Sequence, residues 1–120
     1  MTPHPKLLDH FTNPRNAGTL PCPPAIRVQT DNPACGDTLI LYVETDGQQI
    51  TNVRYQVRGC TASIAAGSAL TTLLEGRSIS TLNNLQASDI EAEIGELQPA
   101  SKHAAVLCRD TVTRLLQALR

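Results

Sequence analysis

The hydrophobic pattern of the chain changes its period near residue 60. Between residues 25 and 59, three segments alternate apolar with polar residues or are rich in β-branched and aromatic ones: "AIRVQT", "TLILYVET" and "ITNVRYQVRG". Asp46-Gly47 separates the second segment from the third and favours a tight turn, so these two strands are expected to form an antiparallel hairpin. From residue 61 onward, apolar residues recur at helical spacing. A chain with its strands first and most of its helices afterwards is expected to be an α+β domain.

Helical patterns flank the three strands. A short N-terminal helix is predicted in "HPKLLDHF" and is ended by Pro14, and a long C-terminal helix is predicted over residues 102–119. Between them, a helix begins at residue 61 and ends near Gly76, and serine N-caps predict two short helical pieces in "SISTLNNL" and "SDIEAEI". The stripe of the helix from residue 61 consists of Ile64, Ala65, Leu70, Leu73 and Leu74. We expect one domain over residues 1–120, a three-stranded antiparallel sheet with helices on one face.

The composition argues against several classes of binding protein. Ten Lys and Arg against 11 Asp and Glu give a net charge of -1, which provides no general attraction to nucleic acid or to an anionic membrane. The three aromatic residues, Phe11, Tyr42 and Tyr55, do not supply a stacking platform for single-stranded nucleic acid. No apolar stretch approaches the roughly 20 residues of a membrane helix, and the first residues lack the pattern of a signal peptide. The sequence therefore predicts a cytoplasmic protein with no nucleic-acid or membrane partner.

Three residues suited to metal binding lie at the ends of predicted elements. Cys35 lies in the turn before the second strand, Cys60 follows the third strand, and His103 lies in the first turn of the last helix. Because the second and third strands pair as a hairpin, Cys35 and Asp37 should lie close to Cys60. If the last helix begins at the same edge of the sheet, His103 completes a group of two thiolates, a carboxylate and an imidazole.

A group of this composition suits zinc or iron, because thiolate and imidazole are good ligands for these metals, whereas calcium and magnesium prefer oxygen. The N-terminal end of the helix that follows Cys60 favours its thiolate. Gly36 and Gly59 would let the backbone approach a bound ion.

Each residue of this group also has a structural interpretation. A single cysteine is more often a small buried residue than a ligand, and we interpret Cys22, which lies between two prolines, in this way. Asp37 alone could be a turn residue, and His103 alone could be an exposed residue at the start of a helix. The residue pattern by itself leaves both interpretations open.

Four segments resemble the IscU and NifU N-terminal-type family of iron-sulfur cluster scaffolds, over nearly the whole chain and in the order of that family. They are "LLDHFTNPRNAG" at residues 7–18, "NPACGD" at residues 32–37, "VRYQVRGCTASIAAGSALTTLLEGRS" at residues 53–78 and "KHAAVLCRD" at residues 102–110. The resemblance implies a scaffold or carrier, not an enzyme, on which a 2Fe-2S cluster is built and then passed to acceptor apo-proteins. A cysteine desulfurase would supply the sulfide and a separate donor the iron.

The resemblance also implies which residues bind. Cys35, Cys60 and His103 would be ligands, Asp37 would keep the cluster or iron labile, and zinc would be able to occupy the empty site. At Ala104 the sequence departs from the family, whose members place there a cysteine that is both a ligand and the usual sulfur acceptor.

Cys108 is the nearest thiol to the departure at Ala104. It lies four residues on, about 6 Å along the same helical face, so it is a candidate for the missing ligand. It also continues the apolar stripe of the last helix, which suits a core residue. A second departure is "LQPASK", which keeps little of the segment that a dedicated Hsp70-type chaperone would recognise, and this puts chaperone-assisted transfer in doubt.

Two other functions remain open from the sequence. The chain could be a zinc-containing sulfur acceptor that relays persulfide from a cysteine desulfurase. It could also be a degenerate family member that binds metal and interacts with other proteins, for which Ala104 is the main support.

Overall fold

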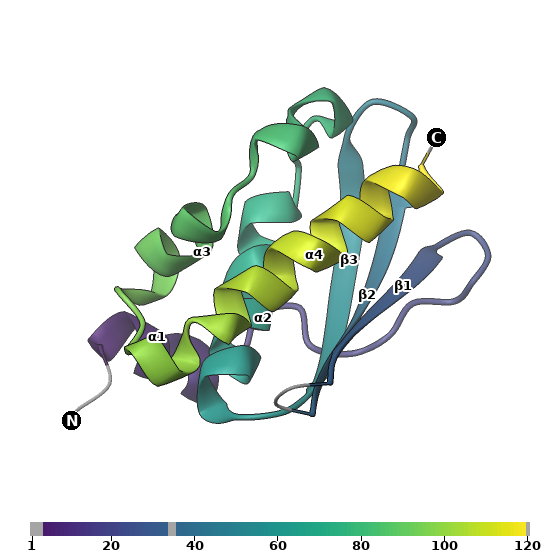
Figure 1. Ribbon diagram of the computed structural model, residues 1–120. Coiled ribbons are helices and arrows are strands. Elements are labelled where there is room, and N and C mark those ends of the chain that lie inside the picture. The colour runs from purple at the N-terminus through teal and green to yellow at the C-terminus, as the bar shows by residue number, and fades with distance from the viewer. Residues whose placement is uncertain (1–3, 34–35, 120) are drawn as a thin grey trace.

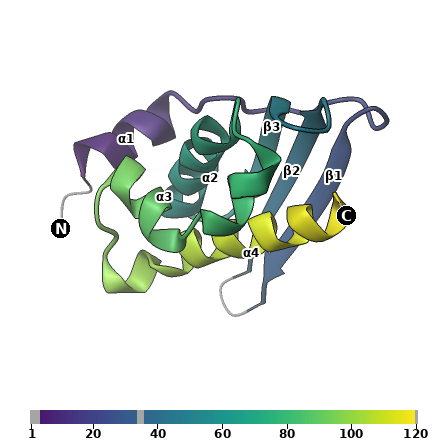
Figure 2. The ribbon, with the colours of Figure 1, turned by 90° about the horizontal axis from the view of Figure 1, so that it is seen from above.

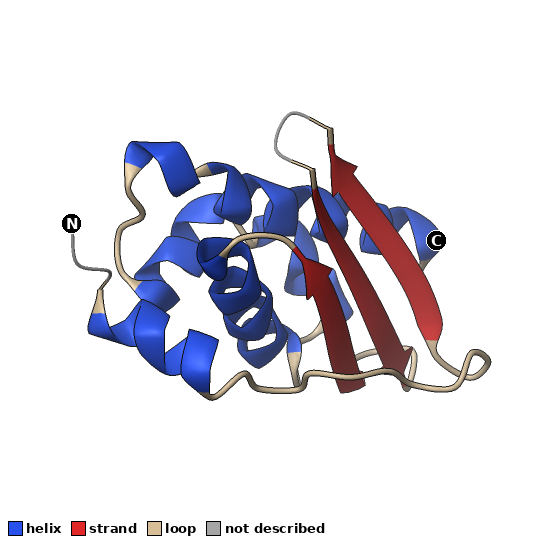
Figure 3. Cartoon of the chain, turned by 90° about the horizontal axis from the view of Figure 1, so that it is seen from below, coloured by secondary structure: helices blue, strands red, loops and turns tan. Residues whose placement is uncertain are grey.

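A three-stranded antiparallel sheet forms one layer of the protein and helices form the other (Figure 1). The computed structural model describes residues 4–33 and 36–119. The strands β1 (Ile26–Asn32), β2 (Asp37–Thr45) and β3 (Ile50–Arg58) lie side by side in that order. Seen from above, the helices gather on one side of the strands (Figure 2), and the view from below shows the three strands next to one another (Figure 3). The predicted α+β class and the antiparallel pairing of β2 with β3 are confirmed.

The core lies between this sheet and two helices, α2 (Thr61–Leu74) and α4 (His103–Ala118). Alternate residues of the central strand, Leu39, Leu41 and Val43, are 0% exposed and face these helices. The alternation is the one expected of a strand with a single covered face.

Helix α2 is buried on nearly every side, so the predicted apolar stripe was too narrow. Ser63 and Ser68 are buried, whereas Ile64 and Leu73 are only half-buried. The reason is that α2 contacts the sheet, the N-terminal helix and α4 at once, and an enclosed helix needs no amphipathic pattern. The helix ends where predicted, since Gly76 follows its C-cap with φ +76°.

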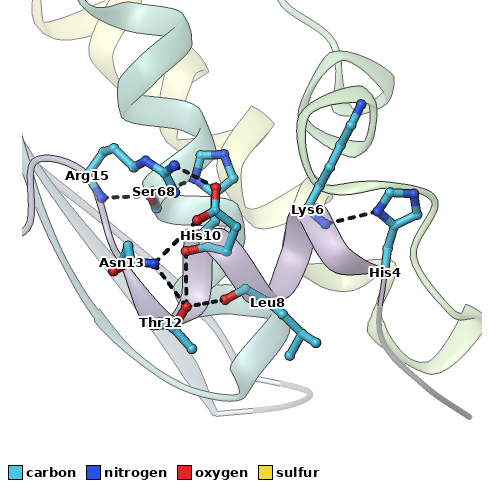
Figure 4. Close-up of polar contacts among 9 residues, drawn as sticks. His4, Lys6, Leu8, His10, Thr12, Asn13, Arg15 and Ser68 are labelled. Atoms are coloured by element: carbon cyan, nitrogen blue, oxygen red, sulfur yellow. Dashed lines mark hydrogen bonds and ion pairs between the residues drawn. The ribbon is translucent and has the colours of Figure 1, made fainter.

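The N-terminal helix α1 (Pro5–Thr12) is fastened to the middle of α2 by polar contacts (Figure 4). His10 Nδ1 lies 2.8 Å from Ser68 Oγ, which also accepts the backbone N–H of Arg15 at 2.8 Å. Because that oxygen already accepts from Arg15, the Ser68 hydroxyl is free to donate to a neutral His10 ring. Burial lowers the pKa of His10, which agrees with the neutral form.

The loop after α1 runs beside the outer edge of β3. The backbone N–H of Gly18 donates to the carbonyl of Tyr55, and the N–H of Tyr55 donates to the carbonyl of Asn16, each at 2.9 Å. This loop therefore covers the sheet edge that the hairpin leaves open.

Two 3₁₀ turns and a short helix connect α2 to α4: η1 (Ile79–Asn84), α3 (Ala87–Ile94) and η2 (Pro99–Ser101). The two predicted helical pieces thus exist, but the predicted serine cap of the second is wrong. Gln86 is the N-cap of α3, and its backbone N–H donates to the Asp89 carboxylate at 2.8 Å. This bond is the half of a capping box in which the side chain at the third helical position accepts from the backbone N–H of the N-cap residue. In the residues described, no helix is both long and apolar enough to cross a membrane.

Candidate metal centre

Three side chains from distant parts of the sequence meet at the end of the sheet where β2 begins and β3 ends. The Sγ of Cys60 lies 3.7 Å from Asp37 Oδ2 and 3.7 Å from His103 Nε2, and the last two atoms are 3.1 Å apart. Among the residues described, these three form the group whose ligand atoms all lie within 4.8 Å of one another. The predicted convergence of Asp37, Cys60 and His103 is therefore present in the fold.

Asp37 reaches this point because of the register of the hairpin. It is the first residue of β2, and its neighbour Thr38 pairs with Arg58 at the end of β3, so Asp37 lies beside the residues that lead to Cys60. Its side chain is buried, with 4% of the residue exposed. Gly59 provides the space, because a Cβ built there would lie 2.7 Å from the carboxyl carbon of Asp37.

Cys60 occupies the N-cap of α2 and is exposed. The residue at this position precedes the first turn, where the backbone N–H groups of a helix point outward and the positive end of its dipole lies. Ser63, three residues on, is buried, and its hydroxyl lies 3.4 Å from Cys60 Sγ and donates to Asp37 Oδ2. Sequence reasoning missed Ser63, although a side chain at the third position of a helix lies next to its N-cap.

His103 is the first residue of α4, which begins at the same sheet edge, as the prediction required. Its Nδ1 lies 3.1 Å from the carbonyl oxygen of Ala100 in η2. A carbonyl only accepts, so Nδ1 carries the hydrogen and Nε2 of the neutral ring presents a lone pair to Asp37 Oδ2. Two electron-rich atoms 3.1 Å apart require a cation between them, either a proton on Nε2 or a metal ion.

The donor set is a thiol, a carboxylate and an imidazole. Sulfur and nitrogen donors with one carboxylate match zinc and iron and do not match the all-oxygen preference of calcium or magnesium. Cys60 is exposed and His103 is partly so, with 26% of its side chain accessible, so the group opens to solvent on one side. An ion bound there could exchange with a partner without unfolding of the protein.

The other predicted thiols lie elsewhere or outside the described residues. Cys35 is not among the described residues, so its place in the group stays a prediction. Cys108 lies in the core, 1% exposed, and is not one of the three converging residues; burial raises the pKa of its thiol to about 12. Whether it binds a metal is not tested by this geometry. Cys22 is exposed, so its interpretation as a small core residue is wrong; the proline-rich loop around it runs over the surface.

The chain is similar to known proteins over nearly its whole length. Residues 2–119 match the family model described as NifU-like N terminal domain. The scaffold protein IscU of Aquifex aeolicus is 38% identical over 109 residues, which cover 89% of this chain and 69% of that protein. The bifunctional protein NifU/MnmA of Rubrobacter xylanophilus is 38% identical over 94% of this chain, but the chain spans only 23% of its length.

A solved structure has the same fold. It is a NifU-like protein (N-terminal) from Brucella abortus, with a TM-score of 0.61 and 19% identity, and the alignment covers 96% of this chain and 80% of that one. Because the family model spans residues 2–119, this chain belongs to the NifU-like N terminal domain family.

Proposed function

We propose that this protein is an iron-sulfur cluster scaffold that receives iron and sulfide as cargo, holds a labile 2Fe-2S cluster and releases it to acceptor apo-proteins. The observation that carries the proposal is the convergence of Asp37 Oδ2, Cys60 Sγ and His103 Nε2 at an exposed edge of the sheet. Membership of the NifU-like N terminal domain family and similarity to a protein named as an IscU scaffold support it.

In this proposal Cys35, Asp37, Cys60 and His103 hold the cargo, and Cys108 is a fifth candidate. Thiolates and an imidazole are established protein ligands of iron-sulfur clusters, whereas a carboxylate is a weaker ligand of the softer cluster iron. The chain would thus bind the cluster firmly through sulfur and nitrogen, and the ligand position of the carboxylate would exchange readily. Its role is that of a carrier, with no reaction catalysed on another substrate.

The partners follow from the cargo and are equally proposals. A cysteine desulfurase would deliver the sulfur as a persulfide, and a two-electron reductant would convert it to sulfide. A second donor would supply the iron, and apo-proteins would take the finished cluster. The departure in "LQPASK" leaves a dedicated chaperone doubtful. A cytoplasmic location remains a prediction from the sequence.

A second function is favoured by the exposure of Cys60 at a helix N-cap, where a sulfur is reachable by a partner enzyme. The four predicted ligands would complete a tetrahedral zinc site, and the protein would then accept sulfur from a desulfurase instead of building a cluster. A third function, metal binding by a degenerate member, differs from this one in predicting no sulfur transfer.

Anaerobic reconstitution with iron, cysteine and a cysteine desulfurase separates these functions. The scaffold proposal predicts a visible chromophore with two iron atoms for each cluster, lost in Cys60→Ala and kept in Cys22→Ser, which changes an exposed cysteine outside the site. Zinc retention with sulfur added to a cysteine, detected by mass spectrometry, would favour the sulfur acceptor. Zinc retention with neither sulfur addition nor chromophore would leave the degenerate member.

A further inference from the structure

Ser63, like Ser68, departs from the usual behaviour of a buried hydroxyl in a helix. The buried residues Thr71 and Thr111 each donate to a carbonyl three or four residues earlier in their own helix, at 2.7 and 2.8 Å. Serine and threonine hydroxyls within helices commonly make this bond, because the carbonyl lies within reach of the side chain. Ser63, 2% exposed, instead donates to the Asp37 carboxylate, which lies on another element.

The hydroxyl of Ser63 touches two members of the candidate metal centre at once. It bonds to Oδ2 of Asp37 and lies 3.4 Å from Cys60 Sγ. Oδ2 is also the carboxylate oxygen that lies 3.1 Å from His103 Nε2. Ser63 therefore contacts, from the buried side of the site, the Asp37 oxygen that both Cys60 Sγ and His103 Nε2 approach.

The surroundings of Asp37 show why such a contact matters. Gly59 lies next to the carboxyl group, where an added Cβ would be 2.7 Å from the carboxyl carbon and from Oδ1 and 3.1 Å from Oδ2. The bond from Ser63 favours the staggered position of the Asp37 side chain in which Oδ2 lies toward the sulfur and the imidazole, and its removal should weaken that preference. A hydroxyl that fixes a ligand in this manner acts on a bound metal through that ligand.

We propose that Ser63 is a positioning residue that holds Asp37 Oδ2 toward the point shared by Cys60 Sγ and His103 Nε2, and so sets the strength with which the site holds a metal. This inference deepens the proposed function and rests on it for the identity of the cargo. The alternative is that Ser63 only satisfies a buried carboxylate and thereby stabilises the fold.

Cobalt(II) tests the proposal, because its absorption reports the ligands and because binding of the ion alone needs no cluster assembly. Ser63→Ala is expected to lower the affinity for cobalt, measured by competition with a chelator, about tenfold, in the range found when groups that orient metal ligands are removed. Its ligand-field bands should move toward those of Asp37→Ala, while the sulfur-to-cobalt band of Cys60 remains.

Ser68→Ala is the matched control, since it removes a buried hydroxyl from the same helix at a place bonded to His10 and to Arg15. Its cobalt affinity and spectrum should equal those of the wild type, although its thermal stability falls. Wild-type affinity and spectrum in Ser63→Ala, or equal losses in both variants, would overturn the proposal.

Cobalt binding and cluster assembly by the wild type test the proposed function separately from the role of Ser63. A wild type that binds cobalt but assembles no cluster contradicts the scaffold and leaves the comparison of Ser63 with Ser68 valid. A wild type that binds no cobalt overturns both.

Discussion

Helix α2 carries two polar clusters with similar residue types and opposite properties. In its middle, the Ser68 hydroxyl meets an imidazole, His10, and a backbone N–H, so donors and acceptors are matched in a closed space. At its first turn, the Ser63 hydroxyl donates to the Asp37 carboxylate and lies near the Cys60 thiol, and Nε2 of His103 lies 3.1 Å from the same carboxylate oxygen. The middle cluster pairs donors with acceptors, whereas the first-turn cluster brings together a thiol, a carboxylate and an imidazole, which are all metal-binding groups.

Position along the helix explains this difference. The first turn lies where the sheet ends and solvent begins, so Cys60 is exposed, while Ser68 is 0% exposed beneath α1. A closed polar network stabilises a fold, and metal-binding groups that open to solvent on one side are available for binding.

The largest expected difference is in reactivity, between the exposed thiol of Cys60 and the buried thiol of Cys108. In the folded metal-free protein at pH 8, iodoacetamide is expected to label Cys60 and to label Cys108 at least about 1000-fold more slowly, because burial raises the pKa of the Cys108 thiol to about 12 and closes access to it. Peptide mapping by mass spectrometry measures both rates in one sample. Rapid labelling of Cys108 without unfolding would show that the interior next to α2 is open.

The two imidazoles should separate binding from stability. His103→Ala removes a metal donor and is expected to lower the affinity for cobalt about 100-fold, with little change in urea unfolding. His10→Ala leaves the Ser68 hydroxyl without its partner and is expected to cost about 1–3 kcal/mol of unfolding free energy while cobalt affinity stays the same. The reverse assignment of the two effects would refute the contrast.

Substitution of two glycines should also separate metal affinity from stability, because each new Cβ would collide with a different side chain. In Gly59→Ala the new Cβ would lie 2.7 Å from Asp37 Oδ1, so the carboxylate must shift and cobalt affinity should fall about tenfold. In Gly67→Ala the Cβ would lie 2.6 Å from the ring of Tyr55, an overpacking that should cost about 1–3 kcal/mol of stability without changing the affinity. Calorimetry of unfolding and chelator competition measure the two quantities. An unchanged affinity in Gly59→Ala would mean that Asp37 does not contribute to binding.

The smallest effect is a pH dependence of the closed cluster. Burial lowers the pKa of folded His10 below its ordinary value of 6.5, so below that pH the unfolded chain binds a proton that the folded chain resists, and stability falls as the pH falls. His10→Gln keeps a group that can bond to Ser68 and does not titrate. The loss of unfolding free energy between pH 7.5 and pH 5.5 should therefore be smaller in His10→Gln than in the wild type, and an equal loss would contradict this role of His10.

Local patterns predicted the fold and part of the site. The alternation of apolar residues and the Asp46-Gly47 turn were sufficient for the hairpin, and the hairpin register was sufficient to bring Asp37 beside Cys60. The start of α4 could not be placed from a pattern, because it depends on how that helix packs on the sheet. His103 was therefore only a conditional member of the group, and the condition is met.

Two residues show where the patterns failed. Ser63 was overlooked because a serine in a helical stretch is usually interpreted as a solvent-facing residue, whereas α2 is buried on nearly every side and Ser63 with it. Cys108 fitted both a ligand and a core position by helical spacing, and spacing carries no information about the depth of a side chain. Its 1% exposure places it in the core, while its role as a ligand stays a prediction.

The central claim is that Cys60, His103 and Asp37 hold one metal centre, and X-ray absorption of the iron-loaded protein tests it most directly. Iron is expected to have sulfur neighbours at about 2.3 Å and nitrogen or oxygen neighbours at about 2.0 Å. The nitrogen and oxygen signal should weaken in His103→Ala, and the sulfur signal should weaken in Cys60→Ala. Iron surrounded by oxygen alone, or a spectrum that neither variant changes, would contradict it.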